Sequence, residues 1–387
     1  MRLGLDARYA TDHFPGIGRY ILGLAQGLAE LTPGHRLVLI VNQAFAAGRY
    51  ALTALADLPN VELHPVAVGP FSPQQQLVLP LLARQLQLDL LHSPYYVKPY
   101  VGLPCPSIVT IFDMNGWRFP RSLTWRGRIF YRVTMALAVR TSAMIITGSA
   151  SAQADLRHVY RLPAHRLAVT PLAAERRFQP QPPEVLAAAR ARYQLPADYV
   201  LYVGSNKPHK NLERLVQAWA RVVATGVNAA TPLVLAGHEA GGGPSLRQLV
   251  TAADIERHVR FLPNIADDDL PALYSGATIF AFPSYYEGFG LPPLEAMACG
   301  TPVLCAYATS LPEVVGDAAL TVDPFSMPEI AEGLQQLLAN PQLRRDLSAR
   351  GLQRARTFSW RRTALATLEV YARVMRETKR GQGGFRV

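Results

Sequence analysis

The sequence predicts an α/β protein with two domains, each built around a parallel sheet. Three observations carry this prediction. The chain has 387 residues, more than one hydrophobic core usually holds. Short apolar segments alternate with amphipathic ones along most of its length, as strands and crossover helices do in parallel sheets. A proline-rich segment at 174–183 interrupts this alternation, which then restarts.

The first domain is predicted over residues 1–173. Its clearest helix is 17–31, where apolar residues recur every three or four positions on one face. Apolar segments bounded by polar or turn residues are expected to form strands at Leu3–Ala7, Leu37–Asn42, Val61–Val68, Leu88–His92, Ser107–Asp113, Ala143–Gly148 and Arg166–Pro171.

The second domain is predicted over 184–362, after the break at 174–183, which is interpreted as a hinge. Two such halves are expected to face each other across a ligand cleft, with the carboxyl ends of their strands toward it. Strands are expected at Tyr199–Gly204, Leu233–Gly237, Val259–Leu262, Thr278–Pro283, Val303–Ala306 and Leu320–Val322.

The composition excludes several classes of protein. Hydrophobic residues make up 49% and charged residues 17%, which is typical of a packed globular protein and not of a disordered chain. No apolar run approaches the ~18 residues of a membrane span. The N-terminus is a poor signal peptide, because Arg2, Asp6 and Arg8 interrupt it. Three scattered cysteines indicate neither a disulfide framework nor a zinc site, and a cytoplasmic location is expected.

The net charge of +11 is unevenly distributed. Residues 1–180 hold 18 Lys and Arg against 9 Asp and Glu, and the segment 114–154 contains no acid at all. Arginines alternate there with aromatic residues, which suits a peripheral contact with anionic lipid at the inner membrane face or a phosphate-bearing acceptor. A solvated helix whose aromatic side chains pack inward is the alternative. Nucleic acid is not expected as a partner, since no nucleic-acid-binding module accompanies the segment.

The most informative motif is Ser284-Tyr-Tyr-Glu-Gly-Phe-Gly-Leu-Pro-Pro-Leu-Glu295. It places Glu287 at the end of an apolar strand and Glu295 about one turn inside the following helix. Free N–H groups at the start of that helix suit a diphosphate, and two carboxylates suit the hydroxyls of a sugar and a ribose. The motif therefore predicts a sugar-nucleotide site.

Three further clusters follow predicted strands. The first is a glycine-rich loop with Gly16 and Gly18, expected to approach a ligand closely but poor as a dinucleotide fingerprint. The second is Lys207-Pro-His-Lys-Asn211, whose lysines suit a diphosphate. The third is His238-Glu239 before a run of glycines, where a ligand contact and an ordinary loop histidine are both open.

In this order the motifs resemble those of the retaining glycosyltransferases of family 4, also called group 1, in a subgroup similar to mannosyltransferases. The likeness extends over nearly the whole chain, including Ser310-Leu-Pro-Glu-Val314 and the segment Thr357-Phe-Ser-Trp360. It implies the GT-B fold, with two Rossmann-like α/β domains: an N-terminal domain that binds the acceptor and a C-terminal domain that binds the donor. It also implies a last helix, about 363–380, that crosses back onto the N-terminal domain.

The resemblance implies transfer of a hexose from a nucleoside diphosphate sugar to a glycan or lipid-linked saccharide acceptor in surface polysaccharide biosynthesis. GDP-mannose is the first choice of donor, and neither a metal nor a cofactor is expected. Glu287 would contact the transferred sugar, Glu295 the ribose, and Lys210 the diphosphate. The residues expected to be catalytic are Glu287, Lys210 and Asp113. Those expected to bind donor are Gly16, Gly18, Ser205, Lys207, Lys210, Glu287, Gly288, Phe289, Gly290, Leu291 and Glu295. Those expected to bind acceptor are His92 and Arg118.

The sequence departs from the family pattern at two positions. Phe112 replaces a frequent histidine, so Asp113 or His92 is considered in its place, and Ser205 replaces a frequent arginine. These departures leave a second hypothesis, a non-catalytic sugar-nucleotide binder or assembly protein with a decayed site. An oxidoreductase is disfavoured because the third glycine and the ribose-binding acid of a nicotinamide site are absent.

Overall fold

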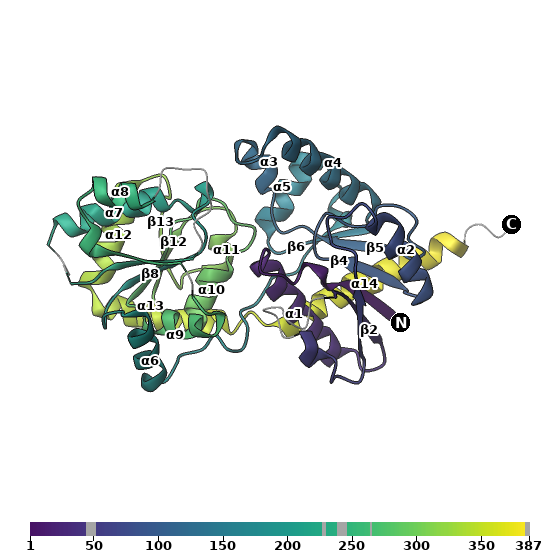
Figure 1. Cartoon of the computed structure of the whole chain (residues 1–387), viewed down its shortest axis with the longest axis horizontal. Coiled ribbons are helices and arrows are strands. Elements are labelled where there is room, and N and C mark those ends of the chain that lie inside the picture. The colour runs from purple at the N-terminus through teal and green to yellow at the C-terminus, as the bar shows by residue number, and fades with distance from the viewer. Residues whose placement is uncertain (44–51, 227–229, 238–245, 264, 384–387) are drawn as a thin grey trace. The chain divides into compact units, whose positions relative to one another are not determined.

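A computed structural model describes residues 1–43, 52–226, 230–237, 246–263 and 265–383 (Figure 1). The chain forms two compact units. The N-terminal unit contains Met1–Ala173 and Ser359–Val387, and the C-terminal unit contains Ala174–Phe358. Each unit is described separately below.

The N-terminal unit contains a sheet of parallel strands in the order β3-β2-β1-β4-β5-β6-β7. Each predicted strand is confirmed within a few residues at either end. The strands are β1 Arg2–Asp6, β2 Arg36–Asn42, β3 Val61–Val66, β4 Leu90–Ser93, β5 Ser107–Thr110, β6 Met144–Thr147 and β7 Leu167–Val169. The central strands are buried throughout, which explains their continuous apolar sequences.

Helices of the N-terminal unit surround this sheet, and the short α3 contacts α4 (Figure 1). They are α1 Pro15–Leu31, α2 Gln75–Gln85, α3 Asn115–Arg118, α4 Trp125–Thr141, α5 Ala150–Tyr160 and the last helix of the chain, α14 Trp360–Gly383. Helix α2 contributes Leu79, Leu82 and Ala83 to a buried cluster with residues of β2 and β4.

The last helix returns to the N-terminal unit, as the family resemblance implies, and packs closely on α1. Gly23 and Gly27 of α1 make this approach possible. A Cβ at Gly23 would lie 2.1 Å from the Trp360 ring, and one at Gly27 would lie 2.7 Å from the Trp360 carbonyl oxygen. The contact therefore depends on two glycines on one face of α1, four positions apart.

The C-terminal unit contains a second sheet of parallel strands in the order β10-β9-β8-β11-β12-β13. The strands predicted for this half are also confirmed. They are β8 Val200–Val203, β9 Leu233–Ala236, β10 Val259–Leu262, β11 Ile279–Phe282, β12 Val303–Ala306 and β13 Leu320–Val322.

Two layers of helices accompany this sheet. Helix α7 Leu212–Ala224 packs with α8 Leu246–Ala252 and α12 Met327–Ala339. The other contacts join α6 Pro183–Tyr193 to α9 Leu270–Gly276, and α10 Leu291–Ala298 to α9, α11 Leu311–Val315 and α13 Pro341–Ala355. Figure 1 shows α7, α8 and α12 together, apart from α6, α9 and α13.

The segment 174–183, interpreted from the sequence as a hinge, is attached to the C-terminal unit. Arg177 forms ion pairs with Glu175, at 3.0 Å, and with Asp267. Phe178 is buried, and its ring centroid lies 5.9 Å from that of Tyr274. The chain therefore passes between the units at Ala173–Ala174 and Phe358–Ser359, and most of the proline-rich segment is part of one unit.

Both sheets have a point where the strand order reverses. In the N-terminal unit it lies between β1 and β4, and in the C-terminal unit between β8 and β11. The crossover connections on the two sides of such a point leave the sheet in opposite directions, so a crevice opens at the carboxyl ends of these strands. The segments after β1, β4, β8 and β11 are therefore where ligands are expected.

Candidate active site

In the C-terminal unit, the segments that follow β8 and β11 are joined at the switch point. Asn211 connects them: its side-chain N–H groups donate to the carbonyl oxygens of Pro283, at 3.0 Å, and Pro324, at 2.7 Å. Asn211 has a φ of 64° and ends the short 3-10 helix Pro208–Lys210. Asparagine tolerates this left-handed conformation better than most residues. The sequence analysis included Asn211 in the lysine motif, but nothing in the sequence indicated that its side chain would link these segments.

Lys210 and Glu287 form the central ion pair of this site. Lys210 Nζ donates to Glu287 Oε1 at 2.6 Å, and the side chains are 16% and 12% exposed. The ammonium also lies 5.2 Å from the centroid of the Phe282 ring. The structure thus brings together two residues that are 77 positions apart in the sequence and that were predicted separately to contact a donor.

The backbone around Glu287 is fixed by two hydroxyl groups: Thr309, which the sequence analysis missed, and Ser310, which it named only as part of a family motif. The Glu287 N–H donates to Thr309 Oγ1 at 3.0 Å, while Ser310 Oγ donates to the carbonyl oxygens of Glu287, at 2.9 Å, and Phe289, at 2.6 Å. Thr309 has a φ of 48°, a strained conformation for a β-branched residue. The sequence alone does not indicate this conformation.

The helix α10 begins directly after this segment, as predicted. Gly290 is its N-cap, with a φ of 124°, and a Cβ there would lie 2.9 Å from Leu311 Cδ2. Pro292 and Pro293 carry no N–H, so Gly290 and Leu291 supply the donors at this helix start. The positive end of the helix dipole and these N–H groups favour an anion.

Glu295 lies inside α10 and is only 1% exposed. The Tyr274 hydroxyl donates to its Oε2 at 3.1 Å. The carboxylate is therefore held in a defined position at the base of the site. Its predicted contact with a ribose stays a prediction, and one of its oxygens already accepts a bond from Tyr274.

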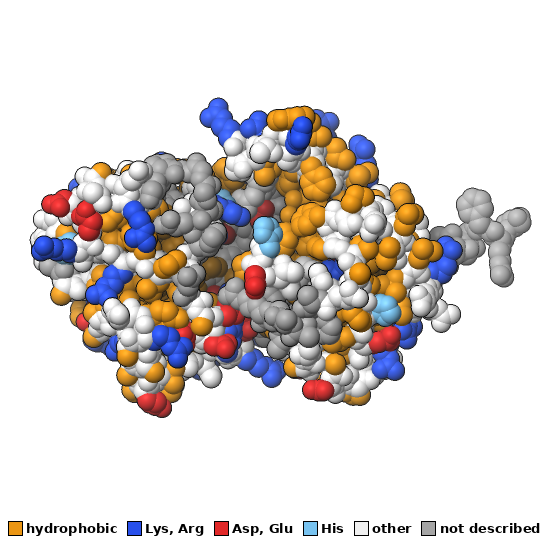
Figure 2. Space-filling model, viewed as in Figure 1, with side chains coloured by type: hydrophobic (Ala, Val, Ile, Leu, Met, Phe, Trp, Pro, Cys, Tyr) orange, Lys and Arg blue, Asp and Glu red, His pale blue; other side chains and the backbone are white. Residues whose placement is uncertain are grey.

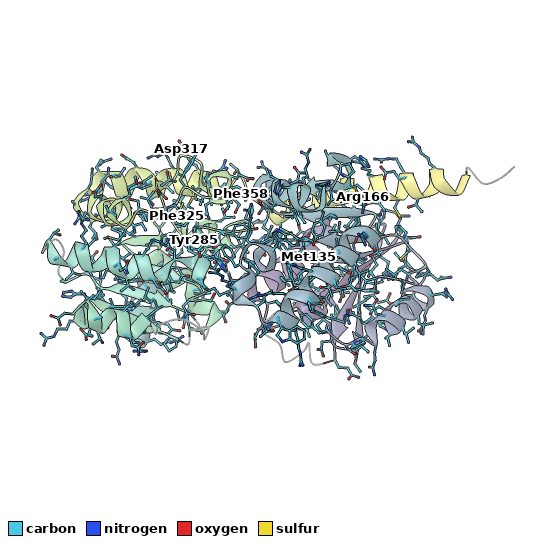
Figure 3. The ribbon with its side chains drawn as sticks, turned by 90° about the horizontal axis from the view of Figure 1, so that it is seen from above. Met135, Arg166, Tyr285, Asp317, Phe325 and Phe358 are labelled. Carbon is cyan, nitrogen blue, oxygen red and sulfur yellow. The ribbon has the colours of Figure 1, made fainter. Side chains whose placement is uncertain are left out.

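The other residues predicted to bind the sugar-nucleotide donor differ in their exposure to solvent. Lys207 is exposed, while Ser205 is partly buried and its carbonyl oxygen accepts a hydrogen bond from Tyr202 at 2.9 Å. Gly288 is buried. Phe289 is also buried, with its ring 5.9 Å from that of Phe358, so its backbone is the part that remains for a ligand (Figure 3 labels Phe358).

His209, between the two lysines, is a buried side chain. Burial, with the neighbouring Lys210 charge, lowers its pKa to about 4, so the imidazole is neutral near pH 7. Its carbonyl oxygen accepts from Ser284 Oγ at 2.9 Å and from the Tyr285 N–H at 3.0 Å. His209 therefore connects the lysine segment to the glutamate segment. His238 and Glu239, the third cluster, lie outside the described residues.

In the N-terminal unit, Gly16 and Gly18 differ from the predicted glycine-rich loop. Helix α1 begins at Pro15, so both glycines belong to its first turn, and the Gly18 N–H donates to the Phe14 carbonyl oxygen at 2.9 Å. A Cβ at Gly16 would meet no atom within 4 Å. The prediction of a loop is therefore wrong, because proline is well tolerated in the first helical turn. A donor contact at this helix start stays a prediction.

His92 is fully buried, which argues against its predicted contact with an acceptor. Its Nδ1 lies 2.7 Å from the Tyr371 hydroxyl of α14, and its Nε2 lies 2.7 Å from Thr110 Oγ1. Burial lowers its pKa to about 3, so the ring is neutral. With both nitrogens paired, His92 attaches α14 to the sheet and has no free polar atom for a ligand.

Asp113 and Arg118 lie after β5. Asp113 Oδ1 accepts from the Asn115 N–H at 2.9 Å and stays partly exposed. The Arg118 side chain is 53% exposed and pairs with Asp155. Phe112, at the position of the missing histidine, packs edge-on against Tyr20 with centroids 5.0 Å apart. Asp113 and Arg118 stay candidates, and among the described residues no three His, Cys, Asp or Glu side chains form a metal-binding group.

Comparisons with known proteins first define the class. The fold resembles that of sucrose-phosphate synthase from Thermosynechococcus elongatus, with a TM-score of 0.77 and 22% identity over 97% of this chain and 100% of that one. The protein is thus a two-domain α/β protein of the GT-B type. Residues 15–175 match the model of Glycosyltransferase Family 4, and residues 190–354 match that of Glycosyl transferases group 1. The chain belongs to this family of glycosyltransferases.

Two relatives illustrate the range of the family. O-antigen chain mannosyltransferase B of Escherichia coli is 38% identical over 232 residues, which cover 60% of this chain. This match spans only 61% of the length of that relative. The MMP alpha-(1->4)-mannosyltransferase of Mycolicibacterium hassiacum is 26% identical, with 97% of this chain and 98% of the relative covered.

Proposed function

We propose that this protein transfers a hexose, with mannose as the first choice, from a nucleoside diphosphate sugar to a glycan or lipid-linked saccharide acceptor. The observation that carries the proposal is the pair of Lys210 and Glu287, 2.6 Å apart at the start of α10. The two relatives named as mannosyltransferases favour mannose, and GDP-mannose is the donor to test first.

The described residues support a division of labour around the donor. The Lys210 ammonium and the N–H groups of Gly290 and Leu291 would hold the diphosphate and stabilise its charge as it leaves. Glu287, whose carboxylate Lys210 orients, would accept hydrogen bonds from the sugar hydroxyls. Such positioning suits retention of configuration, in which the acceptor hydroxyl attacks on the face that the diphosphate leaves.

The second hypothesis, a sugar-nucleotide binder with a decayed site, is motivated by Phe112 and Ser205. It is weakened by the intact network around Glu287, including the strained Thr309. Strain of this kind costs stability and usually persists where a site requires it.

The experiment that tests the proposal has two steps. Thermal stabilisation is first measured with GDP, UDP, ADP, GDP-mannose, UDP-glucose and UDP-N-acetylglucosamine, with NAD as control. A ligand at a hundredfold excess over its dissociation constant should add about 2.7 kcal/mol. Release of free nucleotide from the stabilising donor, with and without acceptor oligosaccharide, is then followed. Stabilisation without any release over hours contradicts the enzyme and favours the binder.

The surface of α4 supports a second part of the proposal, contact with an anionic membrane. Large apolar side chains spaced mostly four residues apart point outward on this helix: Trp125 is 66% exposed, Ile129 55%, Phe130 47%, Val133 51% and Leu137 37%. Among its aromatic side chains, only Tyr131 packs inward. Figure 2 shows hydrophobic side chains gathered over the region of α4. The alternative of a solvated helix with inward aromatics does not fit this arrangement.

The positive charge of α4 also favours contact with an anionic membrane. Arg126, Arg132 and Arg140 are exposed on α4, and no acid lies between 114 and 154. Each arginine close to an anionic surface contributes about 1 kcal/mol of attraction. No described helix has both the length and the hydropathy to cross a bilayer. The contact proposed is therefore with the membrane surface.

Sedimentation with vesicles tests this contact. Vesicles with anionic lipid should bind the protein, neutral vesicles should bind it much less, and Ile129→Glu with Val133→Glu should reduce binding at least tenfold. Leu365→Glu, on an exposed position of α14, is the matched control. Equal binding of the double variant and the control would show that α4 is not the contact.

A further inference from the structure

Four aromatic rings meet at the switch point of the N-terminal unit, close to the start of α1. Tyr9 follows β1, Phe14 precedes α1, Phe71 follows β3 and Tyr95 follows β4. The centroid of Tyr95 lies 5.0 Å from Tyr9 and 5.3 Å from Phe14, and that of Phe71 lies 5.9 Å from Phe14. Four segments of the chain therefore contribute to a single aromatic cluster.

The cluster has a packed side and an open side. Tyr9 is fully buried, Phe14 and Tyr95 are partly buried, and Phe71 is 46% exposed. His13, exposed, packs edge-on against Phe14 with centroids 4.5 Å apart. Phe71 is therefore the ring of this cluster with the most surface open to a ligand.

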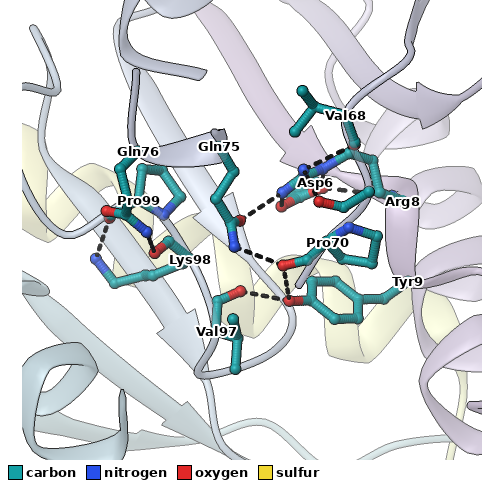
Figure 4. Close-up of polar contacts among 11 residues, drawn as sticks. Asp6, Arg8, Tyr9, Val68, Pro70, Gln75, Gln76, Val97, Lys98 and Pro99 are labelled. Carbon is teal, nitrogen blue, oxygen red and sulfur yellow. Dashed lines mark hydrogen bonds and ion pairs between the residues drawn. The ribbon is translucent and has the colours of Figure 1, made fainter. Parts of the chain in front are cut away.

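A buried polar network fixes the backbone that leads to Phe71, and Figure 4 shows its contacts. Asp6 and Arg8, both 0% exposed, form an ion pair at 2.7 Å. Arg8 also donates to the carbonyl oxygen of Val68, at 3.2 Å, and to Gln75 Oε1, at 3.0 Å. The segment before Phe71 is thus held from several directions.

The same network reaches the segment that carries Tyr95. The Tyr9 hydroxyl lies between the carbonyl oxygens of Pro70, at 3.3 Å, and Val97, and Gln75 donates to Pro70 as well (Figure 4). Tyr9 therefore joins the two segments that carry Phe71 and Tyr95. Rings held in this way lose little conformational entropy when a ligand binds.

Polar groups around the cluster are hydroxyls and a carboxylate. The Tyr95 hydroxyl donates to the Tyr96 hydroxyl at 2.8 Å. Burial, together with Tyr96 and the nearby negative charge of Asp113, raises the pKa of Tyr95. Arg8 is engaged by Asp6 beneath the rings. Aromatic faces beside a carboxylate and hydroxyls suit a neutral polyhydroxylated ring.

We propose that Phe71, Phe14 and Tyr95 form a preorganised platform on which a pyranose ring of the acceptor saccharide stacks. The weakly positive C–H groups on one face of a pyranose pack against aromatic faces, while its hydroxyls reach Asp113 and the tyrosines. The inference rests on the proposed transfer reaction, to which it adds an acceptor of neutral hexopyranoses recognised by its ring. It concerns binding and includes no chemical step.

The test measures acceptor binding separately from transfer. Saturation-transfer NMR of the full chain with α-linked mannotriose should show contact with the ring C–H groups, and Phe71→Ala should abolish it. In steady-state transfer from the active donor, Phe71→Ala should raise the acceptor KM at least fivefold while the donor KM stays within twofold. Phe71→Tyr, which keeps the aromatic face, should restore the acceptor KM.

The matched control is Phe325→Ala in the C-terminal unit. Phe325 is 62% exposed, and its ring centroid lies 5.4 Å from that of Tyr285 (Figure 3). It should leave the acceptor KM unchanged. Because the Phe71 side chain is partly exposed, the Phe71→Ala variant should fold, and its melting temperature should stay close to that of the wild type.

The outcomes separate this inference from the proposed function. If mannotriose contacts Phe71 but no nucleotide sugar supports transfer, the platform stands and the transferase proposal fails. If the protein transfers hexose and Phe71→Ala leaves the acceptor KM within twofold, the platform is wrong. If neither mannotriose nor other neutral oligosaccharides show contact with the wild type, the platform is wrong as well.

Discussion

The two sheets of this protein each place an ion pair at the switch point, and the two pairs differ in their surroundings. Asp6 and Arg8 are both 0% exposed. Carbonyl and amide oxygens occupy the remaining donors of Arg8. Lys210 and Glu287 form an equally short pair, yet each side chain keeps part of its surface open, 16% and 12%.

The difference separates a structural pair from a binding pair. A pair that is completely enclosed has no atom left for a ligand, and its partners fix the surrounding chain. A pair that remains partly open can exchange its internal contact for contacts with substrate. At the same position in two similar folds, we have therefore proposed an aromatic platform in one unit and a charged donor site in the other.

The largest effect is expected from breaking the enclosed pair. Arg8→Met leaves the buried Asp6 carboxylate without its cation and should destabilise the N-terminal unit by about 3–5 kcal/mol. Hydrogen exchange of peptides from this unit measures the loss. The control is Arg2→Met, which removes an ion pair to Glu62 whose side chains are 35% and 36% exposed. That variant should cost less than about 1 kcal/mol, and equal losses would refute the distinction.

The second largest effect is expected from acidification, which should destabilise the N-terminal unit through the buried His92. Its folded pKa of about 3 lies below that of an unfolded histidine, so the stability that neutral His92 provides is complete above the unfolded pKa of about 6.5 and is lost as the pH falls toward 3. Between pH 6.5 and 5 this one group should cost about 2 kcal/mol. His209 adds a similar loss in the C-terminal unit, because its pKa is lowered to about 4.

The variant His92→Gln tests whether His92 is responsible for this loss of stability at low pH. The variant should start less stable at pH 7.5, since it cannot reproduce both hydrogen bonds, but its N-terminal unit should lose less stability on acidification. Unfolding followed by hydrogen exchange of α14 at pH 7.5 and pH 5 gives the two slopes. Identical slopes for wild type and variant would show that another group controls the acid response.

Breaking the partly open pair of Lys210 and Glu287 should affect turnover more than folding. Lys210→Ala should slow transfer at least tenfold, about 1.4 kcal/mol of transition-state stabilisation, because the leaving diphosphate loses a cation. Lys207→Ala, at the exposed neighbouring lysine, should have a smaller effect. Steady-state rates with the donor identified by thermal stabilisation measure both variants, and a near-normal rate for Lys210→Ala would remove this residue from the site.

The smallest effect is expected at Glu295. If its carboxylate binds the ribose, Glu295→Gln should weaken donor binding several-fold, about 1 kcal/mol, because the amide oxygen still accepts a hydrogen bond but no longer a charge-assisted one. Tyr274→Phe, which removes the hydroxyl that donates to Glu295, is the control and should change donor affinity less. Titration calorimetry with the nucleotide sugar reports both, and an unchanged affinity of Glu295→Gln would exclude the ribose contact.

Strands and helices of this fold were predictable because their signals are local. The apolar segments that became β1 to β13 each carry enough hydrophobic and β-branched residues to indicate a strand within one window. Glu287 and Lys210 could be proposed as donor residues because each follows such a strand in a recognisable motif, and the structure shows that they form an ion pair. The start of α1 was mistaken for a loop, since glycines indicate flexibility more strongly than Pro15 indicates a helix start.

Other features depend on contacts between distant segments. Nothing around His92 signals that Tyr371, 279 positions away, would occupy its Nδ1. The sequence also does not reveal that Thr309 would hold the Glu287 N–H, or that Gly23 and Gly27 would meet Trp360. Such contacts follow from how strands and helices pack, which no single window contains.

Two α/β domains, their parallel strands and the motifs of a family 4 glycosyltransferase could be predicted from the sequence, because hydrophobic periodicity and motif spacing are properties of neighbouring residues. Which charged and aromatic side chains remain accessible became clear from the folded structure. Burial depends on every segment packed around a residue, and it encloses Arg8 and His92 while leaving Lys210, Glu287 and Phe71 partly open to a ligand.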